Sequence, residues 1–230
     1  MNTTHYSNLA QLFDFPGPEF AAQGRALSRL LRESYPDAAL ELEQFLLAIP
    51  QRTVDLQELH TRTFDVQALT TLDVGYVLFG DDYKRGELLS NLSREHARAH
   101  NDCGRELADH LPNVLRLIPK LEDRTLADDL VREILVPALM LMIREFDPER
   151  MEKKNANYRI HYKTLIDPAR GDDMTVYRRA LKVLIDVLAK DFDVDDPMMA
   201  MSRSQLKAKP VAEMIMRPFS IELKQVAWQG

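Results

Sequence analysis

The sequence predicts an all-α protein, with a single helical domain of about eight to ten helices. Only 8 of its 230 residues are glycine, which weakens helices. The residues that favour helices most, such as alanine, leucine, glutamate and arginine, are abundant. No run alternates between apolar and polar residues as a half-buried strand does. At 45% apolar and 29% charged, the composition is that of a globular protein with a buried core.

Prolines mark the boundaries of the first helices. Pro16 and Pro18 separate a short helix from a longer one, in which apolar side chains recur at helical spacing. Pro36 stands at a helix start, where its missing N–H costs nothing, and Pro50 follows the same helix. We therefore expect helices over residues 5–14, 19–34, 36–49 and 53–65.

Residues 67–84 have no helical period, and Gly75 and Gly80 interrupt them. This stretch is predicted to be a connecting segment, although it is rich in apolar residues. Helices are expected to resume over residues 86–102, 112–121, 124–146, 148–166 and 174–191. The last of these carries a continuous apolar stripe typical of a helix that faces the core. Pro137 lies inside the helix expected over residues 124–146 and should kink it.

We divide the chain into a helical domain, residues 1–192, and a mobile C-terminal extension, residues 193–230. Residues 193–209 are polar and rich in methionine, as in a linker, and apolar residues return over 211–228. This last stretch could dock on the body, on a partner or on another copy of the chain.

Charge and cysteine usage restrict the function. With a net charge of −6 and a pI near 5.6, binding to nucleic acid is not expected, because that needs clustered Lys and Arg. The single cysteine, Cys103, excludes a disulfide within the chain. The N-terminal residues lack the pattern of a secretory signal, and the longest apolar run is too short to cross a membrane. We expect a cytoplasmic protein that is not inserted into a membrane.

Three potential metal ligands share one face of the helix expected over 86–102. His96, His100 and Cys103 follow at intervals of four and three residues, a spacing that can bind zinc. The glutamate of an H-E-x-x-H motif is missing, and the neighbouring polar residues favour an exposed helix. No metal and no cofactor are expected, and these three residues are kept only as an alternative.

Asp109 and His110 are adjacent, just before a helix expected to begin at Pro112. An aspartate can orient an imidazole for acid–base chemistry, but no Ser or Cys nucleophile motif lies nearby. Alternatively, Asp109 caps the helix and His110 packs half-buried. No phosphate loop, dinucleotide fingerprint or nucleophile elbow is present, so the chain is not expected to be an enzyme.

Residues 58–121 resemble the TorD/DmsD/NarJ family of redox-enzyme maturation chaperones, and the NarJ-like branch most closely. The E-x-x-D-H signature of this family corresponds to Glu106, Asp109 and His110 here, followed by Leu111 and Pro112. Its R-G dipeptide corresponds to residues 85–86, after an apolar stretch at 78–80. The acidic and serine residues that follow the first glycine in the family are two aspartates here, so this part of the pattern carries over incompletely.

The resemblance implies an all-helical cytoplasmic chaperone that binds the N-terminal peptide of the catalytic subunit of a molybdenum oxidoreductase. The client would belong to the dimethyl-sulfoxide-reductase superfamily. The chaperone would keep it ready for cofactor insertion, before export or membrane docking. Proteins that make the molybdenum cofactor would be further partners. Tyr76 and Phe79 either line a groove for the peptide or fill the core beneath a loop. The expected peptide-binding residues are Tyr76, Phe79, Arg85, Glu106, Asp109, His110, Leu111 and Pro112. The competing hypothesis is a helical structural or regulatory subunit that stays in the mature oxidoreductase complex.

Overall fold

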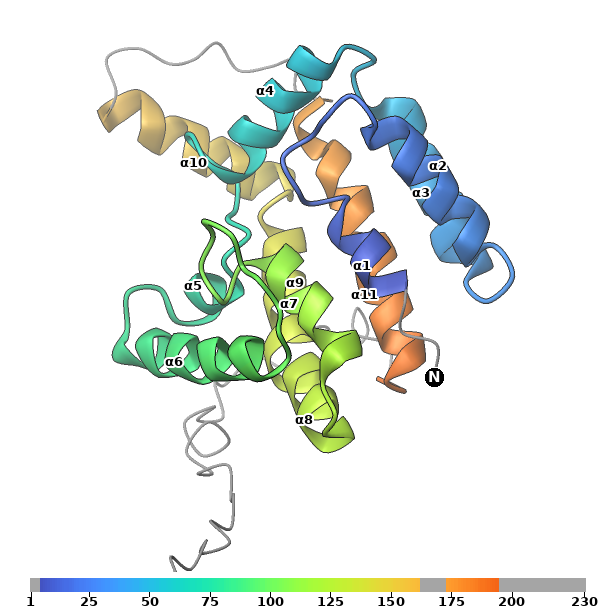
Figure 1. Cartoon of the computed structure of the whole chain (residues 1–230). Helices are drawn as coiled ribbons and strands as arrows, with labels where there is room; N and C mark the ends of the chain where they lie inside the picture. Colours follow the sequence, from blue (N-terminus) through green and yellow to red (C-terminus); the bar gives the residue numbers. More distant parts are fainter. Residues whose placement is uncertain (1–4, 162–172, 195–230) are drawn as a thin grey trace, which may run out of the picture.

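The computed structural model describes residues 5–161 and 173–194 (Figure 1). The described residues form helices and contain no β-strand. The helices are α1 (His5–Ala10), α2 (Phe20–Leu31), α3 (Pro36–Ala48), α4 (Thr53–Phe64), α5 (Val74–Phe79), α6 (Tyr83–Arg98), α7 (Leu111–Leu117), η1 (Ile118–Lys120), α8 (Arg124–Asp129), η2 (Leu130–Leu135), α9 (Val136–Arg144), α10 (Pro148–His161), η3 (Asp173–Thr175) and α11 (Val176–Asp191). The prediction of a single all-α domain is confirmed. Residues 195–230 of the predicted extension lie outside the described part.

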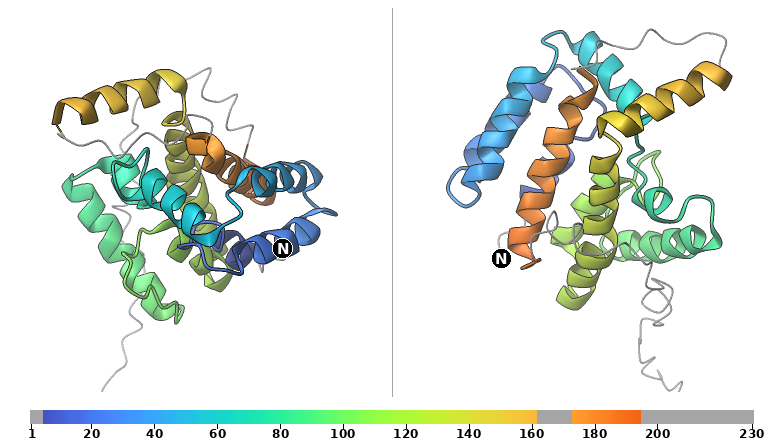
Figure 2. Two further views of the ribbon diagram at one scale, coloured as in Figure 1. Left: turned by 90° about the horizontal axis from the view of Figure 1, so that it is seen from above. Right: turned by 180° about the vertical axis from the view of Figure 1, so that it is seen from behind.

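The core lies between α11 and the helices around it. α3 packs along α11 and α2 packs along α3, while α1 packs against α7 and α9 contacts both α11 and α5 (Figures 1 and 2). An aromatic cluster of Phe45, Phe64 and Tyr177 joins α3, α4 and α11, with ring centroids 5.0 to 5.5 Å apart from that of Tyr177. Within the described ranges no helix is long and apolar enough to span a membrane.

The first helix is fastened to the last helix of the core. Asp191, at the end of α11, accepts hydrogen bonds from His5 Nε2 at 2.8 Å and the Tyr6 hydroxyl at 2.6 Å, and one from the Tyr35 hydroxyl. Burial alone would raise the pKa of Asp191, but these three donors outweigh it and lower the pKa. The two ends of the described chain are thus joined by charge-assisted hydrogen bonds.

Most expected helices are present, with two instructive differences. Residues 67–84, predicted to be a connecting segment, contain α5 and the start of α6. Gly80, at φ +59°, ends α5 after six residues, which is too short for a helical period to be recognised. The helix expected over 86–102 ends at Arg98, and the expected residues 162–166 of α10 lie outside the described part.

The disruption expected at Pro137 takes the form of a wide turn. The six residues of η2, a π-helical segment, lie directly before α9, whose second residue is Pro137. Because proline has no N–H, the carbonyl of Glu133 lacks its usual donor four residues later. A π-helical turn changes the register at this point, so that α8, η2 and α9 remain one unbroken run.

α10 lies at the edge of the molecule, away from the α2–α3 pair (Figures 1 and 2). None of its described side chains, residues 148–158, is fully buried. It is held at one end by Arg178, which pairs with Asp147 at 3.1 Å. This helix forms one wall of the site described next.

Candidate functional site

Two segments that lie far apart in the sequence pair directly through their backbones. Val74 N–H donates to the Asp109 carbonyl at 3.0 Å, and Leu111 N–H donates to the Leu72 carbonyl at 2.8 Å. These bonds form an isolated antiparallel bridge between Asp73 and His110. The bridge brings the start of α5 against the start of α7, and with them the two stretches singled out in the sequence.

Arg85, near the start of α6, ties the two segments together with its side chain. Its Nε donates to Asp109 Oδ2 at 3.0 Å and its Nη2 donates to Asp73 Oδ2 at 2.9 Å. The guanidinium also lies 5.2 Å from the centroid of the Tyr76 ring. On the other side of Asp73, His110 Nδ1 lies 3.2 Å from Oδ1. This hydrogen bond is the main cause of the lowered pKa of Asp73; burial opposes it, and Arg85 adds to it.

Asp109 is buried completely, with 0% of its side chain exposed. Its Oδ1 has no hydrogen-bond partner among the described residues. Gly75 allows this placement, because a β-carbon there would lie 2.6 Å from Asp109 Oδ2. The side chain does not cap α7: the N-cap residue is His110, and no side-chain cap bond is formed. Asp109 therefore acts on Arg85 and does not face solvent.

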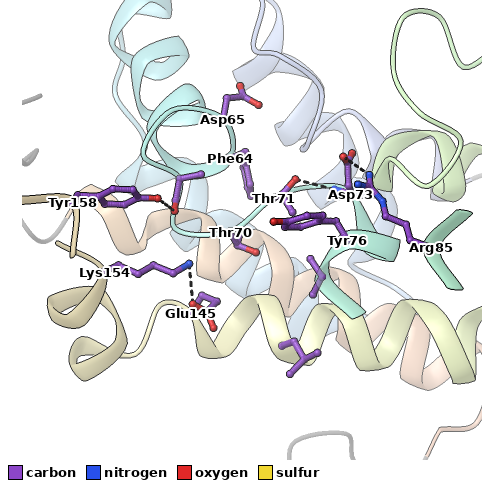
Figure 3. Close-up of a pocket in the computed structure, with 13 residues that line it drawn as sticks. Phe64, Asp65, Thr70, Thr71, Asp73, Tyr76, Arg85, Glu145, Lys154 and Tyr158 are labelled. Carbon is purple, nitrogen blue, oxygen red and sulfur yellow. Dashed lines mark hydrogen bonds and ion pairs between the residues drawn. The ribbon is translucent and has the colours of Figure 1, made fainter. Parts of the chain in front are cut away.

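A pocket of about 690 Å³ opens beside this cluster (Figure 3). Tyr76 and Arg85 form one side of it, and Lys154 and Tyr158 of α10 lie across from them. The full lining is Phe64, Asp65, Ala68, Thr70, Thr71, Asp73, Tyr76, Val77, Arg85, Leu141, Glu145, Lys154 and Tyr158. The pocket thus has an apolar part from α4, α5 and α9 between two charged ends.

The second charged end is built on Glu145, just after α9. Lys154 Nζ pairs with Glu145 Oε2 at 2.9 Å and also donates to the Leu69 carbonyl. The Tyr158 hydroxyl donates to the Ala68 carbonyl at 3.3 Å. Burial would raise the pKa of Glu145, but Lys154 and Arg150 lower it. α10 is therefore attached to the loop after α4 by side chains that cover backbone carbonyls.

The other residues expected to bind peptide have different positions. Phe79 is half-buried and packs against the core, and His110 is half-buried beside Asp73. Glu106 is exposed on the loop before α7 and does not line the pocket. Leu111 and Pro112 are buried in the first turn of α7. Of the eight, only Tyr76 and Arg85 line the pocket.

The alternative metal site is not formed. α6 ends at Arg98, so His100 and Cys103 lie beyond the helix that would have placed them on one face with His96. His96 is buried, and Nε2 lies 3.0 Å from the Ala108 carbonyl while Nδ1 lies 2.9 Å from Asn101 Nδ2. Among the described residues no group of three or more His, Cys, Asp or Glu side chains is arranged to hold a metal ion.

Sequence reasoning missed several residues of the site, above all Asp73. An aspartate directly before an apolar run is typical of a helix start, but α5 is too short for its period to show. Glu145 follows α9, and Lys154 and Tyr158 lie on α10. All three are far along the chain from Tyr76, and nothing local in the sequence connects them with it.

Comparisons with known proteins add no further assignment. No family model matches the chain, and no curated protein matches it. The structure defines an all-α protein with an open pocket of mixed polarity.

Proposed function

We propose that this protein is a cytoplasmic chaperone for a molybdenum oxidoreductase of the dimethyl-sulfoxide-reductase superfamily. It binds the N-terminal peptide of the catalytic subunit and keeps that subunit ready for cofactor insertion. One observation carries the proposal: the stretches at 78–86 and 106–112, which resemble a chaperone family, meet through the Arg85–Asp109 ion pair, next to the Asp73–His110 bridge and beside an open pocket.

The pocket suits an amphipathic peptide. Phe64, Val77 and Leu141 provide an apolar surface, and Tyr76, with 43% of its surface exposed, adds an aromatic ring at the edge. An amphipathic helix or extended segment places its apolar side chains on such a surface and its polar groups at the rim. A volume of about 690 Å³ accommodates only a few side chains, so the pocket would recognise a short segment of the client.

The two ion pairs of Arg85 position this surface. Asp109 and Asp73 hold the guanidinium of Arg85 on two sides, which fixes the cation against the Tyr76 ring. Preorganised groups lose less freedom when a ligand binds, and affinity rises accordingly. In this proposal Asp109 and His110 act through Arg85 and Asp73, and Tyr76 contacts the peptide itself.

Such a chaperone acts by binding the immature client better than the mature one, which shifts the population of client states. The client should first be captured from cell extract with the tagged full chain and identified by mass. Its molybdenum content is then compared in cells with and without this protein. We expect the catalytic polypeptide to be present but lacking cofactor when the chaperone is deleted. Full cofactor occupancy in the deletion strain would reject the proposal, and stoichiometric retention of this chain in the active holoenzyme would support the structural-subunit hypothesis.

A further inference from the structure

The charge of this chain is unevenly distributed along the sequence. Residues 201–230 contain five Lys or Arg and two Asp or Glu, a net charge of +3. Because the whole chain carries −6, residues 1–200 carry −9. A basic C-terminal stretch therefore follows an acidic body. Opposite charge of this kind favours contact between the two.

The same stretch is also apolar. Over residues 211–228 it carries Met214, Ile215, Phe219, Leu223 and the only tryptophan of the chain, Trp228. Apolar side chains in this number are usually removed from water, either in a core or at an interface. Residues 211–228 themselves carry two basic and two acidic residues, and the net positive charge comes from Arg203, Lys207 and Lys209 just before them. An apolar segment with a few charged side chains is the kind of amphipathic peptide that the pocket is proposed to accept.

We propose that residues 211–228 of this chain occupy the pocket when no client is bound, so that the client peptide must displace them. The inference rests on the proposed function only in taking the pocket as the client's site. The body then carries its own competitor, and the exchange protects the apolar surface of the pocket between clients.

The C-terminal stretch is long enough to reach the pocket. Tyr177, in the first turn of α11, contacts Phe64, which lines the pocket. The described chain leaves α11 at its other end, near Asp191, so the two points are separated by roughly the length of α11, about 24 Å at 1.5 Å per residue. Residues 195–210 can span about 50 Å when extended, which is more than twice that distance.

The rim of the pocket offers a carboxylate for one of the two basic side chains of the segment, Arg217 or Lys224. Arg85 is paired with Asp73 and Asp109, and Lys154 is paired with Glu145. No ion pair within the described ranges engages the carboxylate of Asp65, which lines the pocket and is exposed. Asp65 is therefore available to a lysine or arginine of the segment.

Trp228 reports on the segment directly, because its fluorescence is the only tryptophan emission of the full chain. We expect blue-shifted emission and protection from acrylamide in the full-length protein. Asp65→Lys and Tyr76→Glu should shift the emission to the red and remove the protection. Glu33→Lys, the same charge change at an exposed position between α2 and α3, should leave both unchanged.

A synthetic peptide of residues 210–230 provides the second arm. A full-length variant carrying Met214→Asp, Ile215→Asp and Phe219→Asp should have an empty pocket. It should bind the peptide about tenfold more tightly than the natural chain does, as expected if the segment fills the pocket nine-tenths of the time. Adding Asp65→Lys should abolish that gain. The control, with Met198→Asp, Met199→Asp and Met201→Asp in the linker, should bind as weakly as the natural chain.

Three results would overturn the inference: solvent-exposed Trp228 in the natural chain, protection that is insensitive to the pocket variants, or protection that depends on protein concentration and so reports a second copy. The outcome is separable from that of the proposed function. If the synthetic peptide binds in the pocket and the client peptide does not compete with it, the proposed function fails and the self-contact stands. If the client peptide binds in the pocket while Trp228 is exposed throughout, the self-contact fails and the proposed function stands.

Discussion

The carboxylate of Asp109 lies where the side chain of residue 75 would be if that residue were not glycine. A β-carbon built on Gly75 would be 2.6 Å from Asp109 Oδ2, and 3.1 Å from Leu88 Cδ2. Asp109 in turn accepts the hydrogen bond from Arg85 that joins α6 to the segment before α7. A single absent side chain on α5 therefore allows the ion pair beside the pocket to form.

Gly75→Ala should destabilise the protein by about 1–3 kcal/mol, because the new methyl group displaces a carboxylate that is already held by Arg85. Gly86→Ala is the matched control. Nothing lies within 4 Å of a β-carbon at Gly86, which is inside α6, so alanine there should stabilise by about 0.5–1 kcal/mol. Urea unfolding of both variants measures the two changes. Equal effects would contradict the close approach of Gly75 and Asp109.

Asp109→Ala should cost about 3 kcal/mol of stability, because it removes one partner of a buried ion pair. The Arg85 side chain, which is only 17% exposed, would then have Asp73 as its remaining carboxylate partner. A double-mutant cycle with Arg85→Ala should give a coupling energy above about 1 kcal/mol. The ion pair between Arg98 and Glu95 is the control, because the Arg98 side chain is 52% exposed. Its coupling energy should be less than about 1 kcal/mol. An Asp109→Ala variant of natural stability would show that the pair contributes nothing to the fold.

Tyr76→Ala should weaken binding of the client's N-terminal peptide about tenfold while leaving the unfolding midpoint nearly unchanged. The ring is 43% exposed on the wall of the pocket, so its loss removes contact area from the ligand more than from the core. Tyr83→Ala is the control, because Tyr83 is 70% exposed and does not line the pocket. Calorimetric titration with the peptide of the captured subunit provides the comparison. If Tyr83→Ala has the larger effect, the peptide binds elsewhere.

His96 should remain neutral well below the usual pKa of histidine. Burial lowers its pKa, and its neutral form matches its partners: Nε2–H donates to the Ala108 carbonyl and Nδ1 accepts from Asn101. Lys120 bonds to Asn101 Oδ1 at 2.8 Å, which keeps the amide from presenting its oxygen to His96. A pH titration of the imidazole signals, followed by proton NMR, should show this lowered pKa. Lys120→Met should raise it, because a nearby positive charge is removed.

The same effect predicts acid sensitivity. A histidine with a lowered pKa in the folded state contributes its full stability above the unfolded pKa of about 6.5, and this is lost as the pH falls below that value. His60, whose pKa burial also lowers, adds to the loss. The free energy of unfolding should therefore fall between about pH 6.5 and 5, before the carboxylates titrate. His96→Gln should reduce the slope, and an unchanged slope would exclude His96 as a source.

Local sequence signals were sufficient for most of the helices but not for α5 and the metal alternative. The stripe of α11 and the prolines in the first turns of α3 and α7 act within a few residues, so composition and spacing reveal them. α5 has only six residues, and Gly80 ends it through a positive φ. The i, i+4, i+7 spacing of His96, His100 and Cys103 required α6 to continue to residue 103, whereas it ends at Arg98.

The sequence by itself therefore determined the all-α class, the order of the long helices and the two stretches around Arg85 and Asp109. The signals for these features are apolar periodicity, prolines and glycines, which set the local structure within one or two helical turns. Only the tertiary structure decided that Asp109 is buried against Arg85, that Asp73 joins them, and that Lys154 faces Tyr76 across a pocket. These relationships join residues 12 to 78 positions apart, and packing of separate helices, not local preference, sets them.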